Sequence, residues 1–249
     1  MTALIKALEP VIIYQDDFLL VLNKPPFWIV NRAQTTKGKI TVQDWLENNF
    51  DFETIEKGDL RAGIAHRLDK DTSGVLLIAK TIKSLAKVQE QFSRRLIKKQ
   101  YLALVHDIFP DDSQVVAPIN RLSWDREKFG VVLGGKKAKT SFSRQAIYQR
   151  EGERFSLIWA FPKTGRTHQI RVHCQYLSHP IVADPDYVGR KRLRRDLTWC
   201  PRIFLHASAI SFNHPDTGKK VKFQAPLPKD LALALKQLKK AQAFFNDGS

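Results

Sequence analysis

Cysteine is scarce in this sequence, with only Cys174 and Cys200 among 249 residues. A disulfide framework therefore does not hold the fold, which is typical of proteins from a reducing compartment. The sequence has no run of the roughly 20 apolar residues that a transmembrane helix needs, and residues 1–10 contain no apolar stretch long enough for a signal peptide. We therefore expect a cytoplasmic protein without membrane contact.

Acidic residues are few relative to basic ones. The chain has 25 Asp and Glu against 41 Lys and Arg, a formal net charge of +16. Its hydrophobic content of 43% and charged content of 27% are those of an ordinary globular protein. The surplus of positive charge favours a polyanionic partner, most commonly nucleic acid. The alternative is a generally basic surface without a specific partner.

Nucleotide-binding and metal-binding motifs are missing as well. The run Gly134–Lys137 lacks the spacing and the Ser or Thr of a phosphate-binding loop. The candidate ligands His168, His173, Cys174 and His179 are spaced so that they scatter around a helix, which does not suit a zinc site. We therefore expect neither a metal ion nor a cofactor.

Hydrophobic periodicity and turn residues predict most of the secondary structure. The predicted elements are a hairpin over residues 11–23, a helix over 41–49 capped by Thr41, a buried strand over 75–79, a helix over 81–99, strands over 101–106 and 155–161, and a C-terminal helix over 229–245. The segment 51–61 is polar and predicts a surface connection, and residues 111–140 predict a meander of short strands. No repeat or linker divides the chain, so we expect a tail over residues 1–10 and one domain over 11–245.

The first dense cluster of reactive side chains is the polar segment His66–Gly74, directly before the buried strand at 75–79. A polar loop that leads into a buried strand suits chemistry, because the strand is rigid and the loop side chains remain accessible. The second cluster is Lys163–His173, where a Gly and a Thr precede apolar residues at helical spacing. This pattern predicts a loop entering a helix, with His168, Arg171 and Gln175 on one helical face.

These clusters resemble one known family. The sequence His-Arg-Leu-Asp-x-x-Thr-Ser-Gly at residues 66–74 and the sequence Thr-Gly-Arg-x-His-Gln-Ile-Arg at residues 164–171 are similar to signatures of the RluA family of pseudouridine synthases. The resemblance also covers Asn-Lys-Pro at 23–25, the Lys-x-Tyr-x-Ala-Leu-Val pattern at 99–105 and the segment 179–184, and it spans residues 11–228. The chain departs from the family at Phe27-Trp28, where a glycine is common.

The resemblance implies three catalytic residues. Asp69 would be the nucleophile, Tyr101 would stack on the target base or transfer a proton, and Arg171 would be the cation that keeps the aspartate charged in a closed pocket. Without the family resemblance, Tyr101 would be interpreted as a half-buried aromatic residue of a strand. The target uridine must leave its stack, and by resemblance Arg67 would fill the vacated space. The alternative for Arg67 is a salt bridge within the loop.

Further RNA contacts are expected from basic and polar residues. The run 190–195 has five cations in six residues and no apolar periodicity, which predicts an exposed loop that grips phosphates or only aids solubility. The expected RNA-binding residues are His66, Arg67, Lys24, Lys163, Arg166, His168, Gln169, Arg192, Arg194 and Arg195.

The fold implied by the resemblance is α+β, a mixed, mostly antiparallel and bifurcated sheet flanked by helices around a central catalytic cleft. Many relatives carry a small RNA-binding domain ahead of this core. The core here begins near residue 11, so we expect no such domain, and we expect a monomer.

The leading hypothesis for function is a synthase acting on large-subunit ribosomal RNA, with a tRNA-modifying enzyme of the same family as the alternative. A non-catalytic RNA-binding protein is less consistent with the sequence, since Asp69, Tyr101 and Arg171 are all intact. A hydrolase that uses Asp69 and Asp71 as a carboxylate pair is weaker still. Such an enzyme needs its two carboxyl groups at a defined separation, and nothing supports that separation for residues two apart in the chain.

Overall fold

The computed structural model describes residues 8–33, 36, 38–57, 60–125 and 127–241. The chain folds into two compact units. The first unit comprises Met1–Gln100 and His206–Leu227, and the second comprises Tyr101–Leu205 and Pro228–Ser249. The expectation of one domain over 11–245 stays a prediction.

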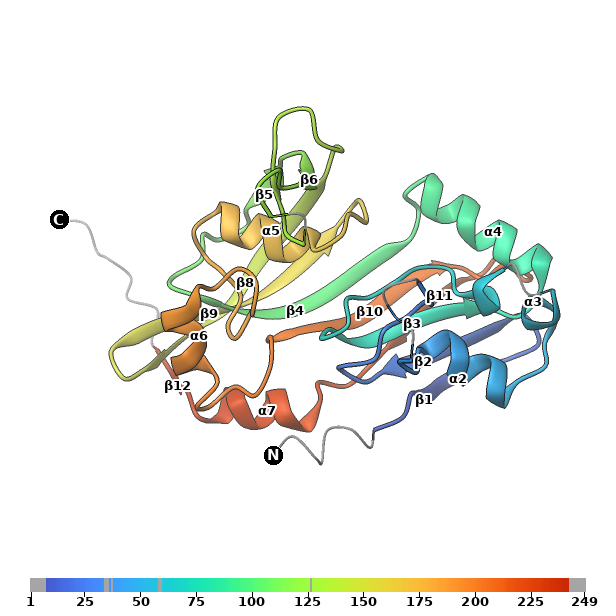
Figure 1. The fold of residues 1–249 in the computed structure, drawn as a ribbon, viewed down its shortest axis with the longest axis horizontal. Coiled ribbons are helices and arrows are strands. Elements are labelled where there is room, and N and C mark those ends of the chain that lie inside the picture. Colours follow the sequence, from blue (N-terminus) through green and yellow to red (C-terminus); the bar gives the residue numbers. More distant parts are fainter. Residues whose placement is uncertain (1–7, 34–35, 37, 58–59, 126, 242–249) are drawn as a thin grey trace. The chain divides into compact units, whose positions relative to one another are not determined.

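The first unit is built on strands with short helices between or beside them (Figure 1). Its elements are β1 (Val11–Gln15), β2 (Leu19–Lys24), α2 (Val42–Asn49), α3 (Glu53–Glu56), the 3-10 helix η2 (Arg61–Gly63), β3 (Ser73–Ala79), α4 (Ile82–Ser93), β10 (Leu205–Asn213) and β11 (Lys220–Gln224). The strand order is β1-β2-β3-β10-β11. All pairs are antiparallel except β3 with β10, which is parallel.

The second unit contains a long antiparallel hairpin and a smaller one. Its elements are β4 (Lys98–His106), β5 (Gln114–Val116), β6 (Ile119–Arg121), β7 (Phe129–Val131), β8 (Lys139–Arg150), β9 (Glu153–Pro162), α5 (Gln169–Tyr176), α6 (Arg190–Asp196), α7 (Lys229–Lys236) and β12 (Lys239–Lys240). The order β4-β9-β8-β12 is antiparallel throughout, and β5 also pairs with β8. The hairpin β6–β7 pairs only within itself, and α5 lies against β7, β8 and β9.

The core of the first unit lies on both faces of its central strands. Every residue of β3 is buried, as are Leu19 to Leu22 of β2. Leu19, Val21, Val75 and Leu77 pack with Val88 of α4. A strand buried on both faces reads as a continuous apolar run, which is why the segment 75–79 was recognisable from sequence.

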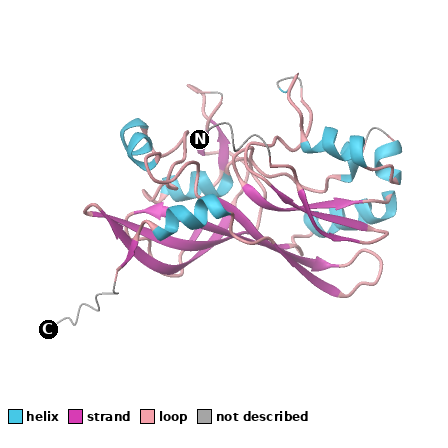
Figure 2. Cartoon of the chain, turned by 90° about the horizontal axis from the view of Figure 1, so that it is seen from below, coloured by secondary structure: helices cyan, strands magenta, loops and turns pink. Residues whose placement is uncertain are grey.

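Several predicted elements are confirmed. The hairpin over 11–23, the strands at 75–79, 101–106 and 155–161, the meander over 111–140 and the loop into α5 are all present. The helix expected at 41–49 is α2, and its first turn has a capping box in which Thr41 and Asp44 exchange hydrogen bonds. Both cysteines are buried free thiols. The α+β class with a mostly antiparallel sheet is confirmed, and Figure 2 shows the helices (cyan) and strands (magenta).

Two helix ends differ from the sequence predictions, and one predicted connection contains a helix. The helix expected over 81–99 ends at Ser93, because Arg95 adopts a left-handed backbone with φ of 58° and Lys98 already starts β4. The helix expected over 229–245 ends at Lys236 and is followed by β12, while residues 242–245 lie outside the described residues. The polar connection at 51–61 contains α3.

The basic run 190–195 is a helix, so the prediction of an exposed loop was wrong. It forms most of α6, which follows Gly189 with φ of 82° and ends at the buried Asp196. The run has no apolar stripe because acidic partners of the second unit, rather than a hydrophobic face, hold the helix in place. Among the described residues, no helix combines the length and apolar character needed to cross a bilayer.

Gly74 is required by the backbone at the start of β3. It pairs with Lys24 of β2 on one side and with Ala207 of β10 on the other. Its φ is +119°, and a Cβ at this position would lie 2.2 Å from the carbonyl oxygen of Ala207. The glycine therefore allows the loop before β3 to join two closely spaced strands.

We predict that Gly74→Ala lowers the free energy of unfolding by about 3 kcal/mol, since it combines backbone strain with a clash against main-chain atoms. Gly152→Ala is the matched control, because Gly152 also has a positive φ (+80°) but a Cβ added there would meet nothing within 4 Å. The control should lose only about 1 kcal/mol. Urea denaturation of both variants measures the difference, and equal losses would contradict the close-approach argument.

Candidate active site

Asp69 lies in a short turn of the first unit, between η2 and β3. Its carbonyl oxygen accepts a hydrogen bond from the amide of Thr72 at 3.1 Å, which closes the turn. The neighbours Leu68, Thr72 and Ser73 are buried, whereas the Asp69 side chain is partly exposed. The turn is therefore anchored on both sides of an accessible carboxylate.

Lys24 supports this turn from below the surface. It is fully buried, and its Nζ donates to the carbonyl oxygens of Pro25 (2.8 Å), Trp28 (3.0 Å) and Lys70 (3.1 Å). A buried ammonium group needs such acceptors. One of these contacts holds Lys70, the residue directly after Asp69. The RNA contact expected for Lys24 stays a prediction.

The end of the turn is fixed by a buried histidine. Ser73 Oγ lies 2.9 Å from His206 Nδ1, and His206 Nε2 lies 3.2 Å from the carbonyl oxygen of Ala225. Since a carbonyl can only accept, Nε2 carries the proton and Nδ1 accepts from the serine hydroxyl. His206 is fully buried, and its two ring nitrogens connect β3 to the segment after β11.

His66 and Arg67 differ in accessibility. His66 Nε2 accepts the amide of Leu77 at 3.1 Å, and its ring packs 5.4 Å from that of Phe92. Burial, together with the positive charge of Lys99, lowers the pKa of His66 to about 3, so the imidazole is neutral at physiological pH. The RNA contact expected for His66 stays a prediction, now for a neutral, hydrogen-bonded ring. Arg67 is exposed.

In the second unit, Tyr101 begins the part of β4 that pairs with β9, opposite Ala160. The residues that follow on β4, Leu102 to His106, are buried, while Tyr101 is partly exposed. The strand thus places a tyrosine ring where the buried core of the unit ends.

Arg171 lies on α5 and is buried in a cage of acidic and aromatic groups. Its Nε donates to Asp184 Oδ2 at 2.8 Å and its Nη2 donates to Asp184 Oδ1 at 2.6 Å, a bidentate pair. Nη2 also donates to Asp186 Oδ2 at 2.5 Å. The guanidinium carbon lies 5.0 Å from the centre of the Tyr187 ring. One positive charge is therefore offset by two negative charges within the same unit.

The acidic and aromatic residues of this cage were not assigned a role from the sequence. Asp184, Asp186 and Tyr187 follow the His-Pro-Ile segment, in the turn before α6. The sequence did contain a usable signal for this cage, because an arginine on a buried helical face needs a carboxylate partner. The sequence contains two aspartates within sixteen residues of it, but it does not say which one is buried.

The Gln169 side chain is buried and hydrogen-bonded within the second unit. Its Oε1 accepts from the Thr164 hydroxyl (2.6 Å) and the Arg166 amide (3.0 Å), and its Nε2 donates to the carbonyl of Lys139 (3.0 Å) and to Thr140 Oγ1 (2.9 Å). The side chain is buried and all of its polar atoms are engaged. This network joins the loop before α5 to β8. Gln169 therefore shapes the loop, and the RNA contact expected for it stays a prediction.

The loop shaped by Gln169 presents two cations. Lys163 and Arg166 are exposed, and Arg166 Nε donates to the carbonyl of Lys137 at 3.2 Å. His168, the residue before α5, is partly buried, with Nδ1 3.0 Å from the Tyr187 hydroxyl. The structure therefore brings His168 and Arg171 together through Tyr187.

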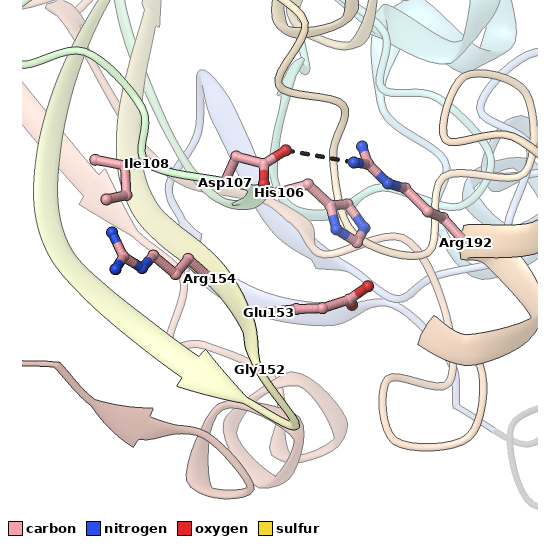
Figure 3. Close-up of a pocket in the computed structure, with 7 residues that line it drawn as sticks. All are labelled: His106, Asp107, Ile108, Gly152, Glu153, Arg154 and Arg192. Carbon is pink, nitrogen blue, oxygen red and sulfur yellow. Dashed lines mark hydrogen bonds and ion pairs between the residues drawn. The ribbon is translucent and has the colours of Figure 1, made fainter.

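Helix α6 borders a pocket of about 430 Å³ within the second unit (Figure 3). Arg192 reaches Asp107 at 3.5 Å across this pocket, and Arg195 reaches Glu153 at 2.6 Å. The helix is anchored at its end, where Asp196 accepts from the amide of Ala183 and lies 2.9 Å from His106 Nε2. His106 therefore pairs with Asp196 and not with its sequence neighbour Asp107.

Within the described part of the chain, no three His, Cys, Asp or Glu side chains are grouped so that they could hold a metal ion.

Comparison with known proteins identifies the family and the fold. The family model described as RNA pseudouridylate synthase matches residues 18–176. A Bacillus subtilis relative, the uncharacterized RNA pseudouridine synthase YlyB, is 37% identical over 92% of this chain and 73% of its own length. The ribosomal large subunit pseudouridine synthase D of Vibrio parahaemolyticus is 36% identical over 92% of this chain and 70% of its own length.

A solved structure agrees with the sequence relatives. Human RNA pseudouridylate synthase domain containing 1 superposes with a TM-score of 0.68 at 28% identity, over 88% of this chain and 84% of that one. Together these matches define the class, an isomerase that acts on RNA. The chain belongs to the RNA pseudouridylate synthase family, which confirms the resemblance drawn from its motifs.

We predict that Asp184→Asn lowers the free energy of unfolding by about 3 kcal/mol, since it removes the buried carboxylate that pairs with both Nε and Nη2 of Arg171 and leaves the buried charge facing the partly exposed Asp186. Glu90→Gln is the control, because the Glu90–Arg94 pair of α4 is exposed and is worth less than about 1 kcal/mol. Urea denaturation of both proteins provides the comparison. A loss for Asp184→Asn as small as that of the control would show that the pair adds little to stability.

Proposed function

We propose that this protein isomerises specific uridines of large-subunit ribosomal RNA to pseudouridine. The observation that carries the proposal is the similarity, over nine-tenths of the chain, to a relative named as a ribosomal large subunit pseudouridine synthase. The surplus of positive charge, +16, suits a polyanionic substrate. The reaction adds and removes no group, so it requires no energy source.

Asp69 is proposed as the reacting carboxylate. The isomerisation needs an ionised acid near both the sugar and the base, and covalent catalysis by Asp is an established strategy for glycosidic bonds. Asp69 is partly exposed, while Lys24, Ser73 and Gly74 fix the turn that carries it. A rigid turn with an accessible carboxylate satisfies the requirement that the reacting group be held in place.

Tyr101 and Arg171 are proposed as its partners in catalysis. Tyr101 offers a partly exposed ring on which the everted uracil can stack. Arg171 is already neutralised by Asp184 and Asp186. We therefore propose that Arg171 contributes to catalysis through directed N–H groups rather than through surplus positive charge. This differs from the simple counter-ion suggested by the sequence.

RNA binding is proposed for the exposed cations. Arg67 is accessible next to the reacting turn, and Lys163 and Arg166 are accessible before α5. On α6, Arg194 is exposed, whereas Arg192 and Arg195 share their charge with Asp107 and Glu153. An RNA phosphate would compete with these carboxylates, so Arg194 should contribute the most of the three.

Two broader features accompany the proposal. We place the reaction in the cytoplasm, supported by bacterial relatives that act on the ribosome and by two free thiols. We also propose that the protein acts as a monomer. Light scattering of the purified protein measures its mass directly, and a dimer mass would overturn this part.

We predict that Asp69→Asn abolishes isomerisation while RNA affinity stays within about tenfold, because the lost charge is local to the chemistry. Tritium release from 5-tritiated uridine in ribosomal RNA reports the reaction. Asp71→Asn is the matched control and should retain activity within about tenfold. Full activity in Asp69→Asn would defeat the assignment, and an inactive Asp71→Asn would favour the carboxylate-pair alternative.

The RNA target is tested by mapping pseudouridines in ribosomal RNA and tRNA from cells with and without the gene. The proposal requires loss of at least one site in large-subunit ribosomal RNA with tRNA unchanged. Loss confined to tRNA would transfer the function to that substrate. Chemical mapping is needed, since the product is an isomer and has the same mass as uridine.

We predict that Arg192→Ala, Arg194→Ala and Arg195→Ala combined weaken RNA binding and reduce the slope of log affinity against log salt by up to about 2, at roughly 0.7 per phosphate contact. The control combines Lys219→Ala, Lys220→Ala and Lys222→Ala, which removes the same charge from the exposed strand β11 and its turn. Equal slopes for the two triple variants would show that α6 contributes only general positive charge.

A further inference from the structure

Tyr187 contacts helix α5 at two points, one helical turn apart. Its ring lies under the guanidinium of Arg171 at 5.0 Å, and its hydroxyl lies 3.0 Å from Nδ1 of His168. The rings of His168 and Tyr187 are perpendicular, with centres 5.8 Å apart. The tyrosine therefore contacts both the start of the helix and the arginine on its first turn.

The hydroxyl also ties this tyrosine to the small hairpin. It accepts the backbone amide of Phe129 on β7 at 3.2 Å. The Phe129 ring in turn packs edge-on against His168 at 5.7 Å. Tyr187 is thus held by main-chain atoms of β7, which cannot rotate away as a side chain can.

The turn that carries Tyr187 is organised by the same carboxylate that binds Arg171. Asp184 Oδ1 accepts the amides of Asp186 at 3.0 Å and Tyr187 at 3.3 Å, in addition to Arg171 Nη2. Asp184 and Asp186 therefore hold the guanidinium through hydrogen bonds, and the Tyr187 ring lies with the guanidinium carbon over it. The ring adds a packing restraint to the hydrogen bonds of the two carboxylates.

The backbone conformation at His168 is a further reason why contacts must hold this residue in place. His168 has a left-handed φ of 54°, which is unfavourable for a residue with a side chain. Its imidazole makes edge-on contacts with the rings of Phe129 and Tyr187, and these contacts hold this conformation. Burial raises the pKa of Tyr187 to about 12, so its hydroxyl remains neutral and keeps both contacts throughout the physiological range.

We propose that Tyr187 is a positioning residue, which holds the Arg171 guanidinium in place with a ring anchored to β7 through its hydroxyl. The inference rests on the proposed function, in which Arg171 contributes to catalysis through directed N–H groups. Aiming such groups correctly matters because a displacement of about 1 Å can slow a reaction by roughly a hundredfold.

The test compares Tyr187→Leu, which removes the ring, with Tyr187→Phe, which removes only the hydroxyl. The control is Tyr176→Leu, because Tyr176 is exposed at the end of the same helix. Single-turnover isomerisation of ribosomal RNA is measured with enzyme in excess, up to saturation. RNA affinity and urea denaturation are measured in parallel on the full chain.

We expect the plateau rate of Tyr187→Leu to fall about a hundredfold and that of Tyr187→Phe about threefold to tenfold. RNA affinity should stay within about threefold, and the control should match the wild type. A merely structural role would reduce the folded fraction, and saturating enzyme would then restore the plateau. Should Tyr187→Leu fail to fold, Tyr187→Phe decides the question, because it deletes a single oxygen.

The outcomes separate the inference from the function on which it rests. An active wild type with unchanged plateau rates in both tyrosine variants would overturn the positioning role alone. A loss of affinity without a loss of plateau rate would also overturn it. A wild type that converts no uridine in ribosomal RNA would overturn the proposed function and the inference together.

Discussion

The second unit depends on the buried pair of Arg171 and Asp184. A guanidinium enclosed in protein is stable only with a carboxylate and well-aligned hydrogen bonds. Asp184 supplies both, and the same carboxylate orders the turn that carries Asp186 and Tyr187. One acidic side chain therefore joins α5 to the segment that leads into α6, and it sets the orientation of the arginine.

The first unit meets a different constraint, which is to hold a polar turn still at the edge of an apolar strand. Lys24 binds the carbonyl of Lys70, His206 binds Ser73, and Gly74 allows the backbone of Ala207 to approach. Each contact satisfies a buried polar atom or removes a steric conflict. The Asp69 carboxylate is left partly exposed on a rigid turn, as a reacting group requires.

The sequence was informative where a residue's role depends on its chain neighbours. The apolar run 75–79, the cap at Thr41 and the loop before α5 follow from local spacing and were predicted. Local pattern failed at α6, because its partners come from distant segments: Asp107 and Glu153 pair with its arginines, and His106 pairs with Asp196. The contacts of Lys24 with Lys70 and of Gln169 with β8 were not predicted for the same reason, since these partners lie far away in the chain.

The sequence alone determined the family, the fold class and the basic character, because motifs and composition survive without coordinates. It also marked Asp69, Tyr101 and Arg171 as candidates. Tertiary structure decided which polar residues are buried and which carboxylate each cation meets. Those outcomes depend on distances between segments far apart in the chain, and desolvation and hydrogen bonding, which act over a few ångströms, are set only when the chain has folded.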